Sequence, residues 1–366
     1  MISIGIVGAG AIVRSSHLPA YRKAGFDVAA VADVDGERAR ALASEFGVQR
    51  AYDDADALIA SGVDVVDIAV PAEAQPEIAL AAIAAGKPVL CQKPFALSLP
   101  EAARVVEAAE QAGVPLAVNQ QMRWSPLVRR AHELVTSGVI GEPERLAFDI
   151  SIHTDFAQWE FLRRAPRLEF LYHSIHYLDA TRYLLGEPTR LTAWAGRAIE
   201  QTTIGETRTL TVLELPNAIA TISADHNDRA RPLNRAELRI VGSRGTIVGE
   251  IGLFYDAPHG RPDRIGVALR DDVEAEMQTL PGAWFPDAFA GPMSDLLASA
   301  AGGPEPLTNG RDNLRTLALV LAAYESVERQ APIDVQEWTS GRLEAVGVAQ
   351  GGSVSTSPIE EKEEHE

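Results

Sequence analysis

Short apolar runs alternate with longer stretches of helical composition through the first 120 residues. The apolar runs predict strands at residues 2–7, 28–32, 63–70, 88–91 and 115–119. The stretches between them predict helices at residues 11–21, 36–46, 74–85 and 100–112. Strands separated by helices of about 10–15 residues form βαβ units with right-handed crossovers. We therefore expect a doubly wound parallel sheet with helices on both faces.

The pattern changes after about residue 122, where strand-like runs follow one another directly. Four helices are expected, at residues 127–137, 172–185, 287–301 and 310–330. The strands are expected at residues 191–198, 207–215, 218–225, 236–241 and 245–250. Turns such as Pro216-Asn217 join consecutive strands, which indicates an antiparallel or mixed sheet. The two late helices are expected to pack on this sheet or to return to the first domain.

These patterns predict an α/β protein with two domains, and a chain of 366 residues is long enough for both. Residues 1–121 are expected to form an NAD-binding Rossmann domain with a doubly wound parallel sheet. Residues 122–340 are expected to form a C-terminal α+β domain for substrate binding and oligomerisation, with a large, mostly antiparallel open sheet. The glutamate-rich residues 350–366 are predicted to be a disordered acidic tail.

Composition narrows the class of protein further. The hydrophobic content of 46% and charged content of 23% are typical of globular proteins. A net charge of −18 argues against nucleic acid and anionic membranes as partners. The single cysteine, Cys91, allows no intrachain disulfide and no cysteine-based zinc site. With no signal-peptide pattern and no apolar stretch of about 18 residues, the expected location is cytoplasmic.

Gly8 and Gly10 follow the first expected strand and open the first expected helix. Glycines there let the backbone turn tightly and approach a pyrophosphate, which binds at the positive end of a helix. Val13 stands where the full fingerprint has a third glycine, so the motif alone also fits a plain tight turn. Ala11 and Ile12 at the helix start complete the candidate pyrophosphate loop.

Asp33 ends the second expected strand, 20 residues after Val13. A carboxylate at this place accepts hydrogen bonds from the adenosine ribose hydroxyls and repels a 2′-phosphate. No arginine or lysine follows directly, because the next residues are Val34, Asp35 and Gly36. We therefore predict NAD rather than NADP as the cofactor. In the alternative interpretation, Asp33 caps the helix that starts near Gly36.

Lys93 ends another expected strand and precedes Pro94. Open α/β sheets bind their ligands at the carboxyl ends of the strands, which is where Lys93 stands. Its ammonium can hydrogen-bond the oxygen on a carbon that gains or loses hydride. A lone Lys-Pro pair is also compatible with an ordinary loop lysine.

A second group of reactive side chains lies at residues 172–179 (YHSIHYLD). On a helix, Tyr172, His176 and Asp179 fall within one stripe, and His173 lies next to it. Histidine suits the uptake of a hydroxyl proton near neutral pH, and a carboxylate one turn away can orient its ring. The alternatives are a histidine that only packs at an interface and a metal site built on His173 and His176, for which no third ligand is evident, so no metal is predicted.

Taken together, these segments resemble the glucose–fructose oxidoreductase/inositol dehydrogenase (Gfo/Idh/MocA) family, from Gly8 to about Val335. The resemblance is carried by DIAVP at 67–71, AGKPVLCQKP at 85–94, AVNQQMRWSP at 117–126 and RYLLG at 182–186. It implies a Rossmann domain, a C-terminal domain with a large open sheet, and homodimers or homotetramers built on that sheet. It also implies NAD(P)-linked oxidation or reduction of carbohydrate-like hydroxyls.

The resemblance assigns roles to individual residues. Lys93 takes the position of the family's catalytic lysine, and His176 that of its catalytic histidine. Tyr172, His173 and Asp179 are expected to support them by hydrogen bonds, with Asp179 orienting His176. The expected cofactor contacts at the strand ends are Val70, Pro71, Gln75, Gln92, Lys93, Asn119 and Arg123.

Three positions depart from the family pattern. Gln92 replaces the usual glutamate beside Lys93, which removes a charge. Gln75 stands where many members have histidine, and Tyr172 stands in place of an aspartate one turn before the catalytic histidine. The usual Asp/His pair is therefore incomplete, and Lys93 with His176 is expected to handle the proton.

The predicted function is NAD-dependent hydride transfer between the nicotinamide and a hydroxyl-bearing carbon of a sugar, polyol or glycoside. Candidate substrate-binding residues, besides Lys93 and His176, are Trp124, Trp159, Arg163, Arg164 and Trp284. Two alternatives stay open. One is redox-neutral, NAD-dependent glycoside cleavage through a transient 3-keto intermediate, and the other is a non-catalytic NAD-binding sensor. Accumulation of NADH on turnover distinguishes the dehydrogenase from redox-neutral cleavage.

Overall fold

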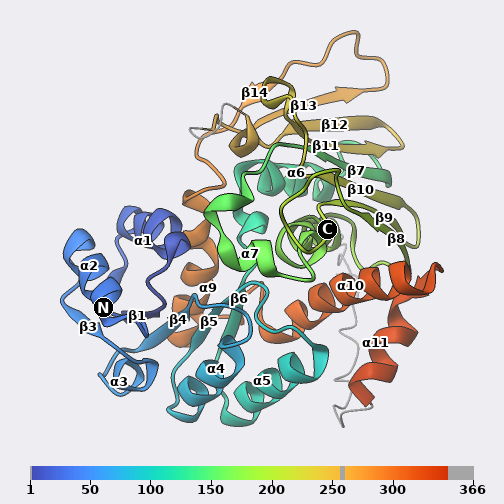
Figure 1. The fold of residues 1–366 in the computed structure, drawn as a ribbon. Coiled ribbons are helices and arrows are strands. Elements are labelled where there is room, and N and C mark those ends of the chain that lie inside the picture. Colours follow the sequence, from blue (N-terminus) through green and yellow to red (C-terminus); the bar gives the residue numbers. More distant parts are fainter. Residues whose placement is uncertain (1, 256–259, 345–366) are drawn as a thin grey trace, which may run out of the picture.

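The chain folds around two β-sheets, one in each half of the molecule (Figure 1). The computed structural model describes residues 2–255 and 260–344. The first sheet has six parallel strands, and the second has nine strands that are mostly antiparallel. This arrangement confirms the predicted fold class. The acidic tail predicted at residues 350–366 lies outside the described residues.

The first sheet has the strand order β3-β2-β1-β4-β5-β6. Its strands are β1 (Ser3–Val7), β2 (Asp27–Ala32), β3 (Arg50–Tyr52), β4 (Val65–Ile68), β5 (Val89–Gln92) and β6 (Leu116–Asn119). The connecting helices are η1 (Val13–His17), α1 (Leu18–Ala24), α2 (Gly36–Phe46), α3 (Ala55–Ile59), α4 (Gln75–Ala84) and α5 (Leu99–Ala112). The order reverses between β1 and β4, and ligands of such sheets bind at the carboxyl ends of the strands beside that point.

Local side-chain caps explain where several of these helices begin. Asp35, Asp54 and Ser98 precede α2, α3 and α5, and each accepts a hydrogen bond from a backbone N–H in the first turn of its helix. Such caps satisfy one of the N–H groups that a helix start leaves without an internal partner.

The second sheet has the order β14-β13-β12-β11-β7-β10-β9-β8-β15. Its strands are β7 (Pro143–Ser151), β8 (Arg190–Gly196), β9 (Arg208–Glu214), β10 (Ile219–Asp225), β11 (Arg235–Gly242), β12 (Gly245–Glu250), β13 (Arg264–Leu269), β14 (Gln278–Thr279) and β15 (Ile333–Asp334). Neighbours β7 and β10 run parallel, whereas the other pairs are antiparallel.

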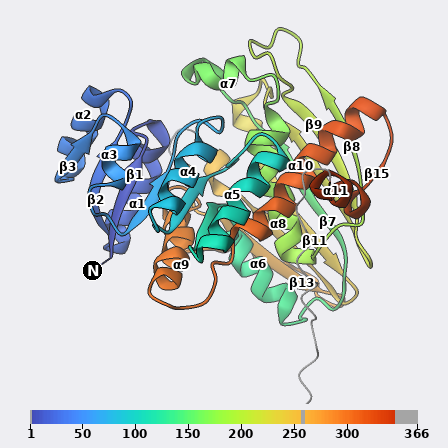
Figure 2. The ribbon, with the colours of Figure 1, turned by 90° about the horizontal axis from the view of Figure 1, so that it is seen from below.

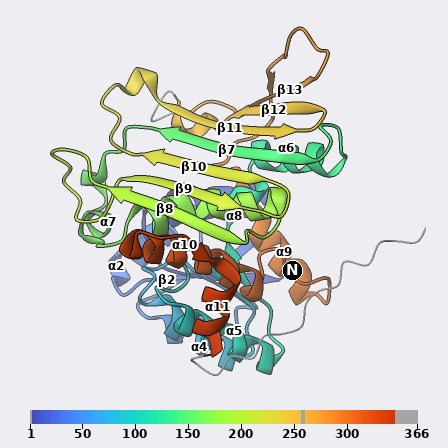
Figure 3. The same ribbon diagram turned by 90° about the vertical axis from the view of Figure 1, so that its right-hand side faces the viewer.

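Within the part of the chain that the structure describes, helices cover one face of the second sheet and leave the other bare. On the covered face lie α6 (Pro126–Thr136), α8 (Ile175–Leu185) and α10 (Gly310–Arg329). Along β7, β9 and β11 buried side chains alternate with more exposed ones, as expected for a sheet with one face in the core. Figure 3 shows the opposite face, where the broad surface from β7 to β12 is uncovered.

The late helices bind the two halves together. Helix α9 (Ala290–Ala300) packs against β5 and β6 of the first sheet, and α10 lies between α5 and the second sheet (Figure 2). The backbone N–H of Val118 in β6 donates to the carbonyl of Thr308, just before α10, at 2.8 Å. Both parts of the expectation for these helices are therefore confirmed: one returns to the first domain, and the other also contacts the sheet.

Some elements differ from the sequence expectation. The patterns did not predict β3, α3 or β7, although Leu146, Phe148 and Ile150 of β7 alternate as a half-buried strand requires. The helix expected from residue 172 begins earlier, with the π-helical turn η4 (Phe170–Ser174) before α8. Within the described ranges, no helix has both the length and the apolar character needed to cross a membrane.

Candidate active site

The loop after β1 fits a dinucleotide pyrophosphate. Gly8 has a φ of 112°, and a Cβ atom there would lie 2.4 Å from the carbonyl oxygen of Ala69, so a larger residue is excluded. At Gly10 a Cβ would meet nothing within 4 Å, so open space adjoins the backbone. Ala11 and Ile12 follow at the start of the helix, where free backbone N–H groups attract phosphate oxygens.

Asp33 stands directly after β2 and touches this loop. Its Oδ2 accepts from the backbone N–H of Ala9 at 2.8 Å, and its Oδ1 accepts from that of Asp35 at 3.0 Å. Helix α2 is capped by Asp35, so the alternative interpretation of Asp33 as the cap is wrong. Arg38 is not among the predicted cofactor contacts, yet its Nη1 lies 3.6 Å from Asp33 Oδ1.

The other predicted cofactor contacts gather at the carboxyl ends of β4, β5 and β6. Val70 and Pro71 follow β4, and Gln75 at the start of α4 donates from Nε2 to the carbonyl of Pro94 at 3.0 Å. Among the described residues, Asn119 Oδ1 and both side-chain polar atoms of Gln120 are buried without a hydrogen-bond partner. Unsatisfied amide groups at this edge suit a ligand with amide and hydroxyl groups.

Lys93 occupies the first position after β5, as the sequence predicted. Its Nζ donates to the carbonyl of Tyr172 at 2.6 Å, which joins the first sheet to η4 of the second half. Burial of the amino group lowers the pKa of Lys93 to about 7. A lysine in this state can both accept and release a proton near neutral pH.

His173 and His176 face the same lysine from the other half. Burial lowers the pKa of both imidazoles well below the usual value. The nearby His226 lowers the pKa of His173 further, and the charge of Lys93 lowers that of His176 further. Both rings are therefore neutral at pH 7. Burial also raises the pKa of the Tyr172 phenol to about 12. The structure brings Lys93 and His176, which were predicted to handle the proton, together with Tyr172 and His173, which were predicted to support them.

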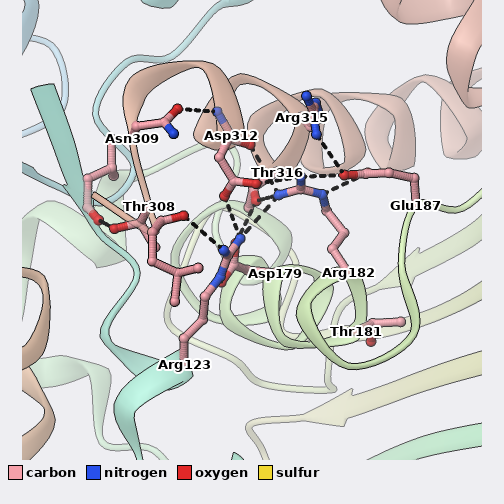
Figure 4. Close-up of polar contacts among 12 residues, drawn as sticks. Arg123, Asp179, Thr181, Arg182, Glu187, Thr308, Asn309, Asp312, Arg315 and Thr316 are labelled. Carbon is pink, nitrogen blue, oxygen red and sulfur yellow. Dashed lines mark hydrogen bonds and ion pairs between the residues drawn. The ribbon is translucent and has the colours of Figure 1, made fainter. Parts of the chain in front are cut away.

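Asp179, in contrast, does not orient His176, which corrects the prediction. Its carboxylate accepts from Arg123 at 2.7 and 2.8 Å and from Thr316 Oγ1 at 2.7 Å (Figure 4). His176 Nδ1 has no hydrogen-bond partner among the described residues. Asp179 points instead to the junction of η2 (Gln121–Trp124), α8 and α10.

The prediction that Arg123 contacts the cofactor is corrected in the same way. Arg123 is 4% exposed, and its N–H groups bond Asp179, Asp312 and the carbonyl of Leu307. The guanidinium is therefore buried and bonded to groups of the protein itself. Arg182 completes the cluster by bonding Asp312 and Glu187 (Figure 4). The cluster is therefore a structural joint between the halves rather than a cofactor contact.

Of the aromatic and basic residues predicted to bind substrate, Trp284 lies at the site. Its ring meets that of His176 edge to face, with centroids 5.1 Å apart, and its Nε1 is buried without a partner among the described residues. The ring of Trp124 instead packs against Gly291 of α9, where a Cβ atom would overlap it. Trp124 is thus better explained by packing.

The remaining substrate candidates lie on or beside α7 (Glu160–Arg164). Arg163 and Arg164 both pair with Glu160 at 2.7 Å, and Trp159 is 37% exposed. Phe161 on the same helix contacts the Tyr172 ring edge to face at 6.0 Å. The segment therefore borders the site, but its two arginines are occupied by their own helix.

Several residues of the site were missed by the sequence analysis. His226, after β10, packs against His173 with ring centroids 4.2 Å apart and the ring planes tilted by 41°, and its Nε2 lies 3.6 Å from the buried Glu169. His17 and Asp67 form a second buried pair at 2.7 Å, beside Gln92. No spacing rule links these residues, because they come from distant segments that only the fold brings together.

Comparison with known proteins agrees with this geometry. Residues 2–120 match the oxidoreductase family with an NAD-binding Rossmann fold, and residues 128–248 match the GFO/IDH/MocA C-terminal domain. D-apiose dehydrogenase of Paraburkholderia graminis is 32% identical over 341 residues, which cover 90% of this chain and 89% of that protein. Myo-inositol 2-dehydrogenase of Thermotoga maritima is 25% identical over 346 residues, covering 91% and 98%.

Among solved structures, an oxidoreductase from Agrobacterium radiobacter in complex with NAD+, L-tartaric acid and magnesium superimposes with a TM-score of 0.81. It is 29% identical, and the match covers 92% of this chain and 99% of that one. The chain belongs to the Gfo/Idh/MocA family of oxidoreductases. Its Rossmann half is a nicotinamide dinucleotide-binding domain, and its relatives include dehydrogenases of sugars and polyols.

Proposed function

We propose that this protein is an NAD-dependent dehydrogenase that oxidises a secondary or hemiacetal hydroxyl of a small sugar or polyol. The observation that carries the proposal is Lys93, whose amino group has a pKa of about 7 and lies between the carboxyl edge of the first sheet and two neutral histidines. The relatives named for apiose and inositol oxidation support a carbohydrate-like substrate.

In the proposed reaction, neutral Lys93 accepts the hydroxyl proton at Nζ while the same carbon loses a hydride. A nicotinamide bound at the strand ends supplies the hydride acceptor. The carbon–oxygen bond becomes a carbonyl, and Lys93 then releases its proton to solvent. His176 is placed to hydrogen-bond the substrate oxygen, since its ring is neutral and His176 Nδ1 has no partner in the described part of the chain.

The proposal includes NAD as the preferred cofactor. Gly8, Gly10, Ala11 and Ile12 would hold the pyrophosphate, and Asp33 would bind the ribose hydroxyls. The Asp33 carboxylate opposes a 2′-phosphate, whereas Arg38 at 3.6 Å would attract one. We expect Asp33 to prevail, because it is nearly buried against the loop while Arg38 is exposed.

The test is NADH absorbance on a panel of sugars, polyols, sugar acids and glycosides, with NAD and NADP run in parallel. Sustained NADH formation with NAD supports the proposal. Cleavage of a glycoside without accumulated NADH would indicate redox-neutral chemistry instead. Binding of NAD with no turnover of any compound would indicate a sensor.

We also propose that the open face of the second sheet joins copies of the chain into a homodimer or homotetramer. Trp194 of β8 stands opposite Leu210 of β9 on this face, and they are 55% and 40% exposed. Ile219 of β10 is 52% exposed nearby. Large apolar side chains gathered on a bare sheet favour self-association. Light scattering of wild type and a Trp194→Glu variant tests this: a monomeric wild type overturns it.

A further inference from the structure

Lys93 is attached to a buried chain of polar side chains that runs through the first half. Gln92 Oε1 accepts from the backbone N–H of Lys93 at 2.8 Å, and Gln92 Nε2 lies 3.0 Å from His17 Nε2. On the other side of the ring, His17 Nδ1 lies 2.7 Å from Asp67 Oδ2. Both His17 and Asp67 are fully buried.

Each member of this chain comes from a different element at the carboxyl edge of the sheet. His17 ends η1, which follows the glycine loop, whereas Asp67 lies in β4 and Gln92 ends β5. The phenol of Tyr21 in α1 donates to Asp67 Oδ2 at 2.8 Å. The chain therefore connects the helix behind the cofactor loop with the backbone of the lysine.

The geometry determines which atom donates and which accepts in each hydrogen bond between Lys93 and Asp67. A backbone N–H can only donate, so the Gln92 atom that faces Lys93 must be the oxygen. The amide nitrogen of Gln92 then faces His17 and donates to its Nε2. Since Nε2 accepts, the single ring proton lies on Nδ1 and is donated to Asp67. His17 is thus a neutral imidazole with its tautomer set from both sides.

The remaining neighbours of His17 are consistent with this assignment. The titratable groups that face it are Asp67 on β4 and the Tyr21 phenol on α1, and burial followed by the Asp67 charge keeps the pKa of Tyr21 well above its usual value. Asn119 of β6 offers a second N–H to Nε2 at 3.4 Å. Phe289 of η7 (Asp287–Phe289) covers the ring with an apolar edge, with centroids 5.1 Å apart.

We infer that Gln92 and His17 are positioning residues for Lys93, and that the glutamine makes this positioning independent of the charge on His17. The inference rests on the proposed role of Lys93 as the proton acceptor. A carboxylate at position 92 would place an acceptor against an acceptor at His17 Nε2, a contact that becomes favourable only when a proton is placed on Nε2 or on the carboxylate. With the amide, no such proton is needed, and Lys93 keeps its place across the working pH range.

The first test reads protonation directly and needs no substrate. Selective ¹⁵N-histidine labelling and long-range ¹H–¹⁵N NMR of the full chain, assigned with His17→Asn, should show the wild-type His17 ring protonated at Nδ1 and not at Nε2. In Gln92→Glu a proton should appear on Nε2, the nitrogen that faces the introduced carboxylate. A wild-type His17 protonated at Nε2 would overturn the inference, whatever the enzyme's activity.

The second test separates positioning from general stability. Gln92→Met removes both hydrogen bonds and should lower kcat about tenfold or more, since small displacements of a reacting group cost up to ~100-fold in rate. The dissociation constant for NAD should change less than about twofold. Gln92→Glu, whose carboxylate can still accept from the backbone N–H of Lys93, should retain more of the wild-type kcat than Gln92→Met, a rescue by the conservative variant that a purely structural role would not give.

Tyr21→Phe is the matched comparison, because it removes the contacts of the phenol with Asp67 and with His17 Nδ1 but leaves the link from His17 through Gln92 to Lys93. It should lower the melting temperature, and its kcat should fall by less than that of Gln92→Met. A Gln92→Met enzyme with wild-type kcat would contradict the positioning role. If Lys93→Met were fully active, the proposed function itself would fail, although the NMR result for His17 would stand.

Discussion

Arg123 and Asp179 form a bidentate ion pair that is almost completely shielded from solvent. Arg123 Nε and Nη2 donate to the two oxygens of Asp179 at 2.8 and 2.7 Å, and the side chains are 4% and 0% exposed. Arg123 follows β6 of the first sheet, whereas Asp179 lies on α8, one turn after His176. The pair therefore sets how the helix that carries His176 sits relative to the sheet that carries Lys93.

The first prediction concerns Asp179→Asn. Asp179→Asn removes one of the two carboxylates that neutralise the buried Arg123 and leaves Asp312 alone beside it, so we expect a loss of about 3–5 kcal/mol in the free energy of unfolding. Denaturant titration measures this. The control is Glu133→Gln, which breaks the exposed pair with Arg130 and should cost less than about 1 kcal/mol. Equal effects of the two variants would contradict the structural role of the joint.

The same cluster predicts a loss of stability in acid. Burial opposes ionisation of Asp312, but Arg182 and Arg123 outweigh it and lower its pKa below the ordinary value of 3.8. Because the folded pKa is lowered, the stabilisation is fully present above about pH 4 and disappears as the pH falls through the lowered pKa. Unfolding free energies measured from pH 6 to 2.5 should show this decline, and Asp312→Asn should flatten part of it. If the unfolding free energy of Asp312→Asn declined in acid as steeply as that of wild type, Asp312 would not be a source of the acid sensitivity.

The next prediction is the pH profile of the reaction. Lys93 must be neutral to accept the hydroxyl proton, and its pKa of about 7 places the change near neutrality. We expect kcat/KM for oxidation to rise about tenfold per pH unit below pH 7 and to level off above it. The reverse reduction should show the opposite slope above pH 7. A pH profile in which kcat/KM changes only near the ordinary pKa of lysine would contradict this prediction.

Cofactor choice gives the next prediction. Replacing Asp33 with serine removes the carboxylate that repels a 2′-phosphate and leaves Arg38 in place. We expect kcat/KM with NADP to rise about tenfold, equal to about 1.4 kcal/mol. Adding Arg38→Ala should reverse the gain. Unchanged NADP use in Asp33→Ser would mean that other groups exclude the 2′-phosphate.

Trp284 gives a prediction about substrate binding. Trp284→Phe keeps an aromatic ring against His176 and removes the unpartnered indole N–H. If that N–H binds a substrate hydroxyl, KM should rise about two- to tenfold, the range of one net hydrogen bond, with the dissociation constant for NAD unchanged. Trp338→Phe on α11 (Val335–Glu344) is the control, since its indole N–H is also unpartnered within the described residues. A KM equal to wild type would remove Trp284 from the substrate contacts.

The predictability of this fold differs between its halves. Buried parallel strands such as β4 and β5 are mostly apolar, broken only by Asp67 and by Gln92 at the strand end, so their places follow directly from the sequence. β7 was missed because its polar outward residues, Asp149 among them, dilute the apolar signal. The sheet order, with β7 parallel to β10 at the centre, depends on long-range pairing that no local pattern encodes.

The candidate site was predictable where a residue's role follows from its position on one element. Lys93 at its strand end and His176 on its helix are such residues, and both lie at the site. Asp179 was misassigned because helical spacing shows that two side chains share a stripe, but not which partner from another element reaches them first. Here Arg123 reaches the carboxylate, and the histidine gains no bond from it.

The most direct test of the account compares wild type with Lys93→Met on the compound that gives most NADH. We predict that kcat/KM falls by about 10²–10⁴-fold, the usual contribution of a positioned acid or base, while the dissociation constant for NAD stays the same. Lys87→Met, at the opposite end of the same strand, should retain wild-type kinetics. Full turnover by Lys93→Met would contradict the central claim that Lys93 takes up the substrate proton.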